Sequence, residues 1–168
     1  KPKTGKLKVL FPIDDIHIVD LHANFGVTFA NRWHTLLTFI MPTWFTTNHD
    51  ENSWNGTEYE KYGVITKPLA VFSATWNGVP LLYSGQELPN MKRLEFFEKD
   101  PIEWNGTYQH HDFYKVLMNL KSSNTALRGG DSNVATFLLN TSANDKILAY
   151  VRKNGKDEVL VLLNLSKE

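Results

Sequence analysis

Cysteine is absent from the 168 residues, which excludes a disulfide scaffold, a thiolate metal site and a cysteine nucleophile. An excess of charge of either sign is also lacking, because 18 Lys and Arg residues balance 18 Asp and Glu residues. Without a basic field to hold a phosphate backbone, we expect no nucleic-acid partner. Long apolar runs are missing as well, so the sequence predicts no membrane span.

The residues that are present predict a soluble globular domain, since 42% are hydrophobic and 12% are aromatic. The first eight residues are basic, but no apolar segment of signal-peptide length follows them. We therefore expect the chain to begin inside a longer sequence or after processing. Absence of cysteine fits both a reducing cytosol and a bacterial envelope, and we favour a bacterial periplasmic or secreted location.

The pattern divides the chain into three zones, of which the first is mixed. Residues 9–11 and 16–19 are typical of short buried strands, and residues 29–40 have the apolar density of a helix without clear caps. From residue 41 to residue 121 the order is strand, helix, strand, helix. Such an order is typical of a parallel α/β architecture, in which the loops after the strands carry the chemistry.

The second zone begins with a predicted strand over residues 43–47, and a second strand is predicted over residues 79–83. Between them Pro68 should kink or split the helix, and Asn77-Gly78 should end it. Apolar residues three and four positions apart define one face of this helix and of the next. They are Tyr62, Ile65, Leu69, Phe72 and Trp76, and then Phe113, Leu117 and Leu120.

The third zone predicts an antiparallel sheet with strands over residues 134–139, 146–152 and 158–165. Asn154-Gly155 is a typical hairpin turn between the last two. We place a domain boundary near Gly129, with residues 1–128 and 129–168 on its two sides.

The strongest chemical signal is the triplet Asn48-His49-Asp50, which follows the first predicted strand. Asn and Asp there are expected either to cap backbone amides in a turn or to form a site at the carboxyl end of a parallel strand. Neighbouring aromatic side chains are of the kind that stack on sugar rings, although they also suit an ordinary core: Trp44, Phe45 and Trp54.

These residues lie in two segments that match a known family. Residues 45–50, Phe-Thr-Thr-Asn-His-Asp, resemble the fourth signature region of the α-amylase family of glycoside hydrolases. Residues 78–87, Gly-Val-Pro-Leu-Leu-Tyr-Ser-Gly-Gln-Glu, resemble its eighth barrel strand. Their order and spacing match as well. Further likeness to the run from the eighth helix into the C-terminal β-sandwich lies in residues 96–104, 120–127, 147–152 and 158–165.

The resemblance implies part of a (β/α)8 TIM barrel followed by an antiparallel, sandwich-like domain, in a retaining hydrolase of α-1,4-glucosidic bonds in starch-like glucans. Retention uses a nucleophile and an acid/base carboxylate roughly 5 to 5.5 Å apart. By this likeness Asp50 is neither of them but the third carboxylate, which stabilises the transition state through the sugar hydroxyls. His49, Asn48 and Trp54 are then expected to bind the α-glucan or maltooligosaccharide substrate.

The departures from the family concern the other two acids. In the family an Arg stands two residues before the nucleophile, and the acid/base is a Glu. Both of these acids precede the Asn-His-Asp strand in the sequence. The acids before Asp50 are Asp14, Asp15 and Asp20, and none has this context. The chain is therefore expected to be inactive alone, as part of a longer enzyme or as a non-catalytic scaffold or glucan-binding relative. Because two of eight barrel strands are identified, we expect it to self-associate, swap elements or cover the gap with residues 1–40.

The remaining polar candidates have ordinary structural explanations. Glu87 is expected to fix its loop or to pair behind the site, and Arg93 to form a structural ion pair. Glu51 and Glu58 either line the cleft or are solvated at a helix start. His110 and His111 are expected to be exposed, without companion ligands at metal spacing. Since the family's frequent calcium site draws on segments not found here, we predict no bound metal or other cofactor.

Overall fold

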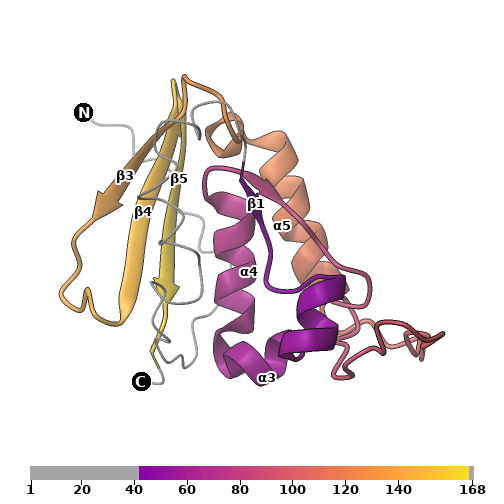
Figure 1. The fold of residues 1–168 in the computed structure, drawn as a ribbon. Coiled ribbons are helices and arrows are strands. Elements are labelled where there is room, and N and C mark those ends of the chain that lie inside the picture. The colour runs from indigo at the N-terminus through magenta and orange to yellow at the C-terminus, as the bar shows by residue number, and fades with distance from the viewer. Residues whose placement is uncertain (1–41, 167–168) are drawn as a thin grey trace.

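Three layers make up the part of the chain that the computed structural model describes, residues 42–166. In Figure 1 the antiparallel sheet of β3 (Ala135–Leu139), β4 (Ile147–Asn154) and β5 (Asp157–Asn164) forms one layer and helix α4 (Thr66–Thr75) the next. The short strand β1 (Thr43–Trp44) and helix α5 (His111–Ser123) lie on the far side of α4 from the sheet. The strands and helix predicted within residues 1–40 lie outside the described residues. Among residues 42–166, no helix is long and apolar enough to cross a membrane.

The first two strands are parallel neighbours, as the sequence predicted. β1 (Thr43–Trp44) pairs with β2 (Val79–Pro80), with Thr43 opposite Val79. Both strands are shorter than expected. The amide of Leu81 still reaches the carbonyl of Trp44 at 2.8 Å, but the amide of Tyr83 donates to the Gln86 side chain at 2.7 Å instead of to a strand. A side-chain acceptor therefore takes the place of the next hydrogen bond between the two strands.

The helical segment between these strands is split, but not at its proline. α3 (Glu58–Tyr62) is followed by a 3₁₀ turn, η2 (Gly63–Ile65), and then by α4 (Thr66–Thr75). Pro68 lies in the first turn of α4, where its missing N–H would have had no helical partner. The predicted break is thus present at η2, and Pro68 is compatible with the helix that follows.

The second helix and the sheet follow the predicted pattern closely. α5 (His111–Ser123) is followed by a short 3₁₀ turn, η3 (Thr125–Leu127). β3 (Ala135–Leu139), β4 (Ile147–Asn154) and β5 (Asp157–Asn164) form an antiparallel sheet in that order. Asn154 pairs with Asp157, so the hairpin turn itself is Gly155-Lys156.

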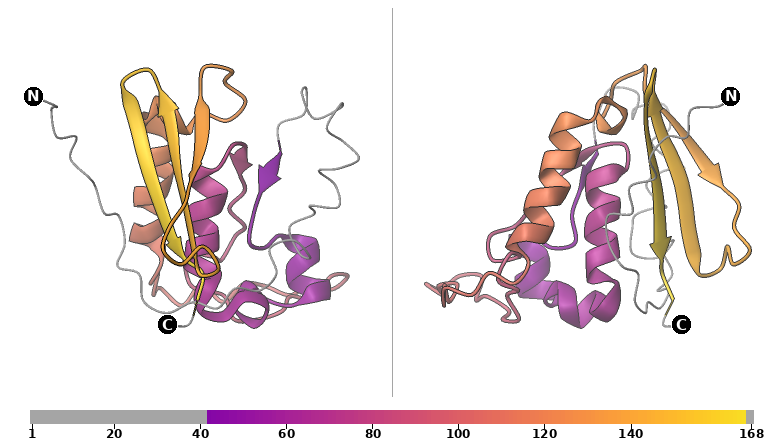
Figure 2. Two further views of the ribbon diagram at one scale, coloured as in Figure 1. Left: turned by 90° about the vertical axis from the view of Figure 1, so that its left-hand side faces the viewer. Right: turned by 180° about the vertical axis from the view of Figure 1, so that it is seen from behind.

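A hydrophobic core lies between α4 and the sheet, and Figure 2 shows these layers from two further sides. Alternation along β5 buries every second side chain on the helix-facing side. The core therefore contains residues from before and after Gly129, where the domain boundary is predicted. That boundary stays a prediction. The buried core residues are Ile65, Leu69, Ala126, Leu127, Tyr150, Val159, Val161, Leu163 and Leu165.

A buried arginine fixes the segment after α5 to the sheet. Arg152 is 1% exposed, and its guanidinium donates to the carbonyls of Ala126 at 3.3 Å and Arg128 at 3.0 Å and to the hydroxyl of Thr136. Burial lowers the pKa of this guanidinium from its usual value. The carbonyl and hydroxyl acceptors satisfy its donors in place of water.

The turn after α4 is a junction between the two strand systems. The carbonyl of Asn77 accepts from Trp44 Nε1 at 2.7 Å, and its side-chain oxygen accepts from the amide of Gly130 at 3.1 Å. Lys121 Nζ donates to the carbonyl of Gly78 at 3.0 Å. A Cβ on Gly78, whose φ is 149°, would lie closer than 3.0 Å to the Trp44 ring. Glycine is therefore required at this junction.

We expect Gly78→Ala to lower the free energy of unfolding by about 2 to 4 kcal/mol, since backbone strain adds to overpacking. Gly106→Ala is the matched control, because Gly106 also has a positive φ, 80°, but a Cβ added there would meet no atom within 4 Å. Its cost should be about 1 kcal/mol. Urea unfolding of both variants measures the difference, and equal losses would contradict the role of the Trp44 contact.

Candidate functional site

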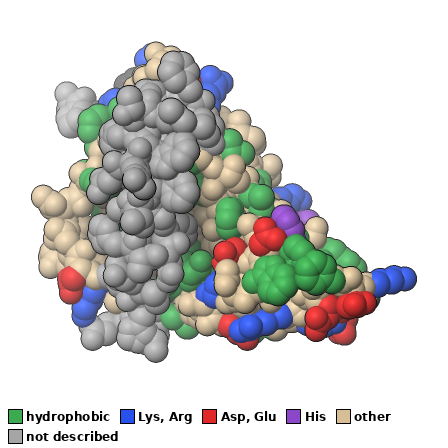
Figure 3. All heavy atoms as spheres, in the orientation of Figure 1, with side chains coloured by type: hydrophobic (Ala, Val, Ile, Leu, Met, Phe, Trp, Pro, Cys, Tyr) green, Lys and Arg blue, Asp and Glu red, His purple; other side chains and the backbone are tan. Residues whose placement is uncertain are grey.

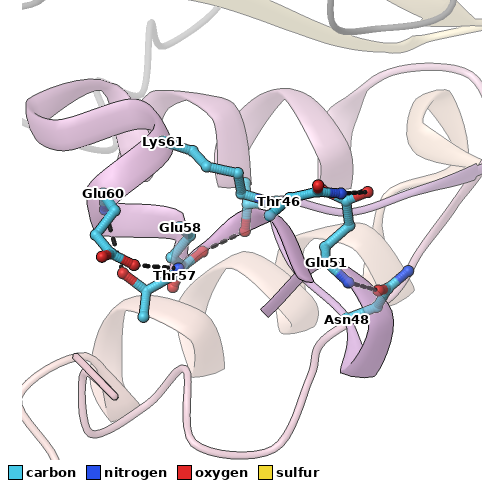
Figure 4. Close-up of polar contacts among 8 residues, drawn as sticks. Thr46, Asn48, Glu51, Thr57, Glu58, Glu60 and Lys61 are labelled. Atoms are coloured by element: carbon cyan, nitrogen blue, oxygen red, sulfur yellow. Dashed lines mark hydrogen bonds and ion pairs between the residues drawn. The ribbon is translucent and has the colours of Figure 1, made fainter. Parts of the chain in front are cut away.

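The Asn-His-Asp triplet lies just beyond β1, and its members have different surroundings. Asn48 Oδ1 accepts from the amide of Glu51 at 2.8 Å and so caps the π-helical turn η1 (Glu51–Asn55), as Figure 4 shows. This is the capping arrangement that was one of the two expectations for the triplet. Asp50 stands at the helix N-cap position, but its side chain makes no capping hydrogen bond. Capping therefore accounts for Asn48 and not for Asp50.

His49 and Asp50 lie side by side and face outward. Their side chains are 69% and 56% exposed, and His49 Nε2 is 3.6 Å from Asp50 Oδ1. An imidazole and a carboxylate in this arrangement present both donors and acceptors to a ligand with hydroxyl groups. Two of the four predicted site residues are thus together and accessible.

Trp54, the fourth predicted site residue, belongs to an aromatic cluster beside this pair. Its ring is 57% exposed and packs against Phe96 and Phe97, with centroids 5.1 and 5.9 Å away. The His49 ring stacks on Phe96, with centroids 6.3 Å apart and planes 22° apart. We call Trp54, Phe96 and Phe97 the aromatic platform. Figure 3 shows hydrophobic side chains gathered beside a histidine and acidic side chains on this face.

Behind the exposed residues lies a buried polar network. Glu58 is 2% exposed, and one of its carboxyl oxygens accepts from the hydroxyl of Thr46 and, at 2.8 Å, from Gln86 Nε2. Gln86 also donates to Thr46 Oγ1 at 2.9 Å and to the hydroxyl of Tyr114 at 3.1 Å. The network joins the segments after β1 and β2 to α3 and α5. It fixes Thr46, four residues before Asp50.

Burial dominates the protonation of this network. Removal from water raises the pKa of the Glu58 carboxyl, although hydrogen bonds from Thr46 and Gln86 oppose the shift. The same burial, together with the nearby Glu58, raises the pKa of Tyr114. Glu58 therefore holds its proton to a higher pH than an exposed glutamate. The expectation of a solvated Glu58 was wrong, because the side chain is buried against Thr46 and Gln86, where it lines a small pocket.

Ion pairs at the start of α3 support the turn that carries Trp54. Glu51 Oε2 pairs with Lys61 Nζ at 2.9 Å, which holds the pKa of Glu51 below its usual value. Thr57 and Glu60 form a capping box, shown in Figure 4. Arg93 pairs with Glu60 at 2.9 Å, so the predicted structural ion pair of Arg93 is confirmed.

Other candidates lie outside the exposed site. Glu87 Oε2 accepts from the amide of Gly85 at 3.1 Å, in keeping with a residue that fixes its loop. His111 is exposed as predicted, but His110 is half-buried, because its ring packs against Tyr59 and Phe113. Burial lowers the pKa of His110. Within residues 42–166, no group of three or more His, Asp or Glu side chains is placed to hold a metal ion.

Two features that the sequence analysis missed had signals in the sequence. Glu58 lies four residues before Tyr62 and so continues the apolar face of Tyr62, Ile65 and Leu69 by one turn. A carboxylate on that face is a candidate for burial. Phe96 and Phe97 are adjacent aromatics in a loop rich in charges, a context in which both rings are hard to bury.

Comparison with known proteins finds two curated proteins that are similar to this chain. Alpha-amylase 2 of Dictyoglomus thermophilum is 25% identical over 133 residues, which cover 72% of this chain. Cyclomaltodextrinase of a Bacillus species is 30% identical over 105 residues, or 60% of the chain. The chain is thus similar to one part of each of these two proteins. No protein-family model matches it.

The fold of the chain also resembles that of a solved structure. Maltogenic α-amylase AmyB from Thermotoga neapolitana superposes with a TM-score of 0.61 over 83% of the chain, at 19% identity. The chain spans about a fifth of its two curated relatives, 22% and 18% of their lengths, and 32% of AmyB. The likeness to α-amylases is therefore a likeness to one part of each.

Proposed function

We propose that the chain is the C-terminal part of the catalytic barrel, with the start of the following sandwich domain, of a retaining hydrolase acting on α-1,4-glucosidic bonds of starch-like glucans. Its partner is then an α-glucan or maltooligosaccharide. The observation that carries the proposal is the parallel pairing of β1 with β2, after which His49 and Asp50 stand exposed beside Trp54. Carboxyl ends of parallel barrel strands are where this architecture has its active sites.

In this proposal Asp50 stabilises the transition state and does not react covalently. Its carboxylate accepts hydrogen bonds from sugar hydroxyls as the ring distorts toward the oxocarbenium-like state. His49 donates to a neighbouring hydroxyl, and Trp54 offers a flat face to a sugar ring. Asn48 contributes through its amide group, since its side-chain oxygen caps η1. A periplasmic or secreted location, where polymeric glucans are met, is part of the proposal.

We expect the 168-residue chain alone not to hydrolyse α-glucans. Double displacement needs two positioned carboxylates besides Asp50, and none of the acids before Asp50, which are Asp14, Asp15 and Asp20, has the sequence context of the family's nucleophile or acid/base. Reducing-sugar release from maltooligosaccharides, beside size-exclusion chromatography for self-association, measures this. Turnover that disappears in Asp50→Ala would contradict the expectation and would assign a role to Asp14, Asp15, Asp20 or Glu51.

The second candidate is a non-catalytic relative that binds glucan or a partner. The exposed aromatic platform beside His49 favours binding in either case. The complete gene product separates the two. An Arg-x-Asp segment and a further Glu before residue 43, with starch hydrolysis by the purified protein, support the enzyme. Their absence, with glucan binding but no hydrolysis, supports the scaffold.

A further inference from the structure

The tetrapeptide Trp-Asn-Gly-Thr occurs twice in the chain, over residues 54–57 and over residues 104–107. An asparagine that precedes a glycine is open to attack on its own side chain, because no side chain on the glycine blocks the approach of the glycine nitrogen. Since the two copies share all four residues, a difference in their reactivity reports the fold around them. The chain therefore contains a matched comparison of one reactive sequence in two settings.

The first copy is held by hydrogen bonds and by burial. Asn55 Nδ2, the nitrogen that would leave, donates to Glu51 Oε1 at 3.0 Å. Gly56 is buried, and a Cβ added to it would lie 3.1 Å from Glu60 Oε2. The amide of Thr57 donates to the same Glu60 oxygen at 2.7 Å. These contacts oppose the backbone rotation that would bring the Gly56 nitrogen onto the side chain of Asn55.

The second copy lies open in the loop between β2 and α5. Asn105, Gly106 and Thr107 are all exposed, and a Cβ added to Gly106 would meet no atom within 4 Å. The amide of Thr107 donates to Asn105 Oδ1 at 3.0 Å. That oxygen takes up negative charge when a nucleophile adds to its carbon, so the amide acts on it as an oxyanion-hole donor does. The side-chain carbonyl of Asn105 is therefore polarised for attack.

The two remaining Asn-Gly pairs are held as well. Asn77 Oδ1 accepts from the amide of Gly130 at 3.1 Å, and Gly78 is buried. Asn154 is the last residue of β4, and its Nδ2 donates to the carbonyl of Thr125 at 3.3 Å. All Asn-Gly pairs of the sequence lie among the described residues 42–166, and only in the pair at residue 105 are both members exposed.

We propose that Asn105 is a self-modification site, at which the chain converts this asparagine into aspartate and isoaspartate. The backbone nitrogen of Gly106 forms a bond to Asn105 Cγ, and its proton passes through water to Nδ2. The Cγ–Nδ2 bond then breaks and ammonia leaves. Water opens the resulting succinimide ring at either of its two carbonyls. One amide and one water molecule thus become one carboxylic acid and one ammonia, with no oxidant or reductant.

The modification changes the loop without requiring a change in the core. The product places a new carboxylate two residues after Glu103, whose carbonyl accepts from the amide of Asn105 at 3.0 Å. Isoaspartate also lengthens the backbone by one carbon atom, which an exposed loop outside helices and strands accommodates. We therefore expect the modified protein to keep its fold and to differ in its charge.

The test incubates the complete gene product in mildly alkaline buffer, folded and in urea, and follows each Asn-Gly peptide by mass spectrometry. In urea, Asn55 and Asn105 should react at similar rates, because their neighbours are the same. In the folded protein Asn105 should retain most of its rate. Asn55 should be slowed on the order of tenfold or more, since it then reacts only through local opening. Chromatographic separation of the isoaspartyl peptide from the aspartyl peptide identifies the succinimide route.

Gly106→Ala is the variant that isolates the attacking nitrogen. Its methyl group should slow the reaction at Asn105 in both states and leave the rate at Asn55 as it is. Equal rates at Asn55 and Asn105 in the folded protein would overturn the proposal, and so would an Asn105 that reacts only in urea. Aspartate formed without isoaspartate would overturn it too, because direct hydrolysis then replaces the ring. Glucan hydrolysis is no part of the measurement, so the outcome is independent of the proposed function.

Discussion

Asp50→Asn in the complete gene product is expected to lower kcat on the order of 100-fold or more, which corresponds to roughly 2.7 kcal/mol or above. An amide is a weaker acceptor than an ionised carboxylate for the hydroxyls of a distorted sugar, so the loss falls on the transition state. Stability should be unchanged, since the Asp50 side chain is 56% exposed and makes no capping hydrogen bond. Steady-state hydrolysis of soluble starch and a thermal unfolding curve measure the two effects.

The control for this variant is Asp145→Asn, which removes an equivalent charge from the exposed loop between β3 and β4. It should leave kcat and stability as they are. Wild-type turnover by a folded Asp50→Asn protein would remove Asp50 from the active site.

The largest loss of stability is expected at Glu58. Glu58→Ala leaves the buried hydroxyl of Thr46 without its carboxylate acceptor, removes one of the acceptors of Gln86 and opens a cavity, which together should cost about 3 to 5 kcal/mol of unfolding free energy. Glu58→Gln keeps an acceptor oxygen and resembles the protonated acid, so its cost should be small. Urea unfolding of both variants tests this, and equal losses would contradict the network.

The pH dependence follows from the raised pKa of Glu58. The folded protein binds this proton more tightly than the unfolded chain, whose carboxyl titrates near its usual 4.5. The contribution of Glu58 to stability is therefore complete below pH 4.5 and declines as the pH rises through the raised pKa. In Glu58→Gln this decline should be absent. Unfolding free energies measured from about pH 4 to about pH 8 give the comparison.

The sequence predicted the local elements because their signals are local. The spacing of apolar residues predicted α4 and α5, and Asn-Gly predicted the last hairpin. The two strand motifs predicted the parallel pair of β1 and β2. Split helices were expected from Pro68, yet the break lies at Gly63–Ile65. The position of the break was not predicted, because a proline in the first turn of a helix does not interrupt that helix.

That His49, Asp50 and Trp54 form a substrate-binding site stays a prediction, and what the sequence indicates correctly is their position near one another. His49, Asp50 and Trp54 lie together at the surface, within one short segment. Partners from distant segments were not predicted. Gln86 reaches Glu58 across 28 residues, and Leu94 reaches Asn52 across 42. Burial of Glu58 and the shape of the platform depend on these long-range contacts, which spacing along one segment does not encode.

The core between α4 and β5 has a consequence for synthesis on the ribosome. Leu69 emerges about ninety residues before Val159, against which its cluster packs. At roughly 5 to 20 residues per second, the apolar face of α4 waits for its cover for about 5 to 20 seconds. The nascent chain thus carries an uncovered helix face while these ninety or so residues are made. We expect that face, Ile65 and Leu69 included, to be where a chaperone that recognises apolar segments binds the growing polypeptide.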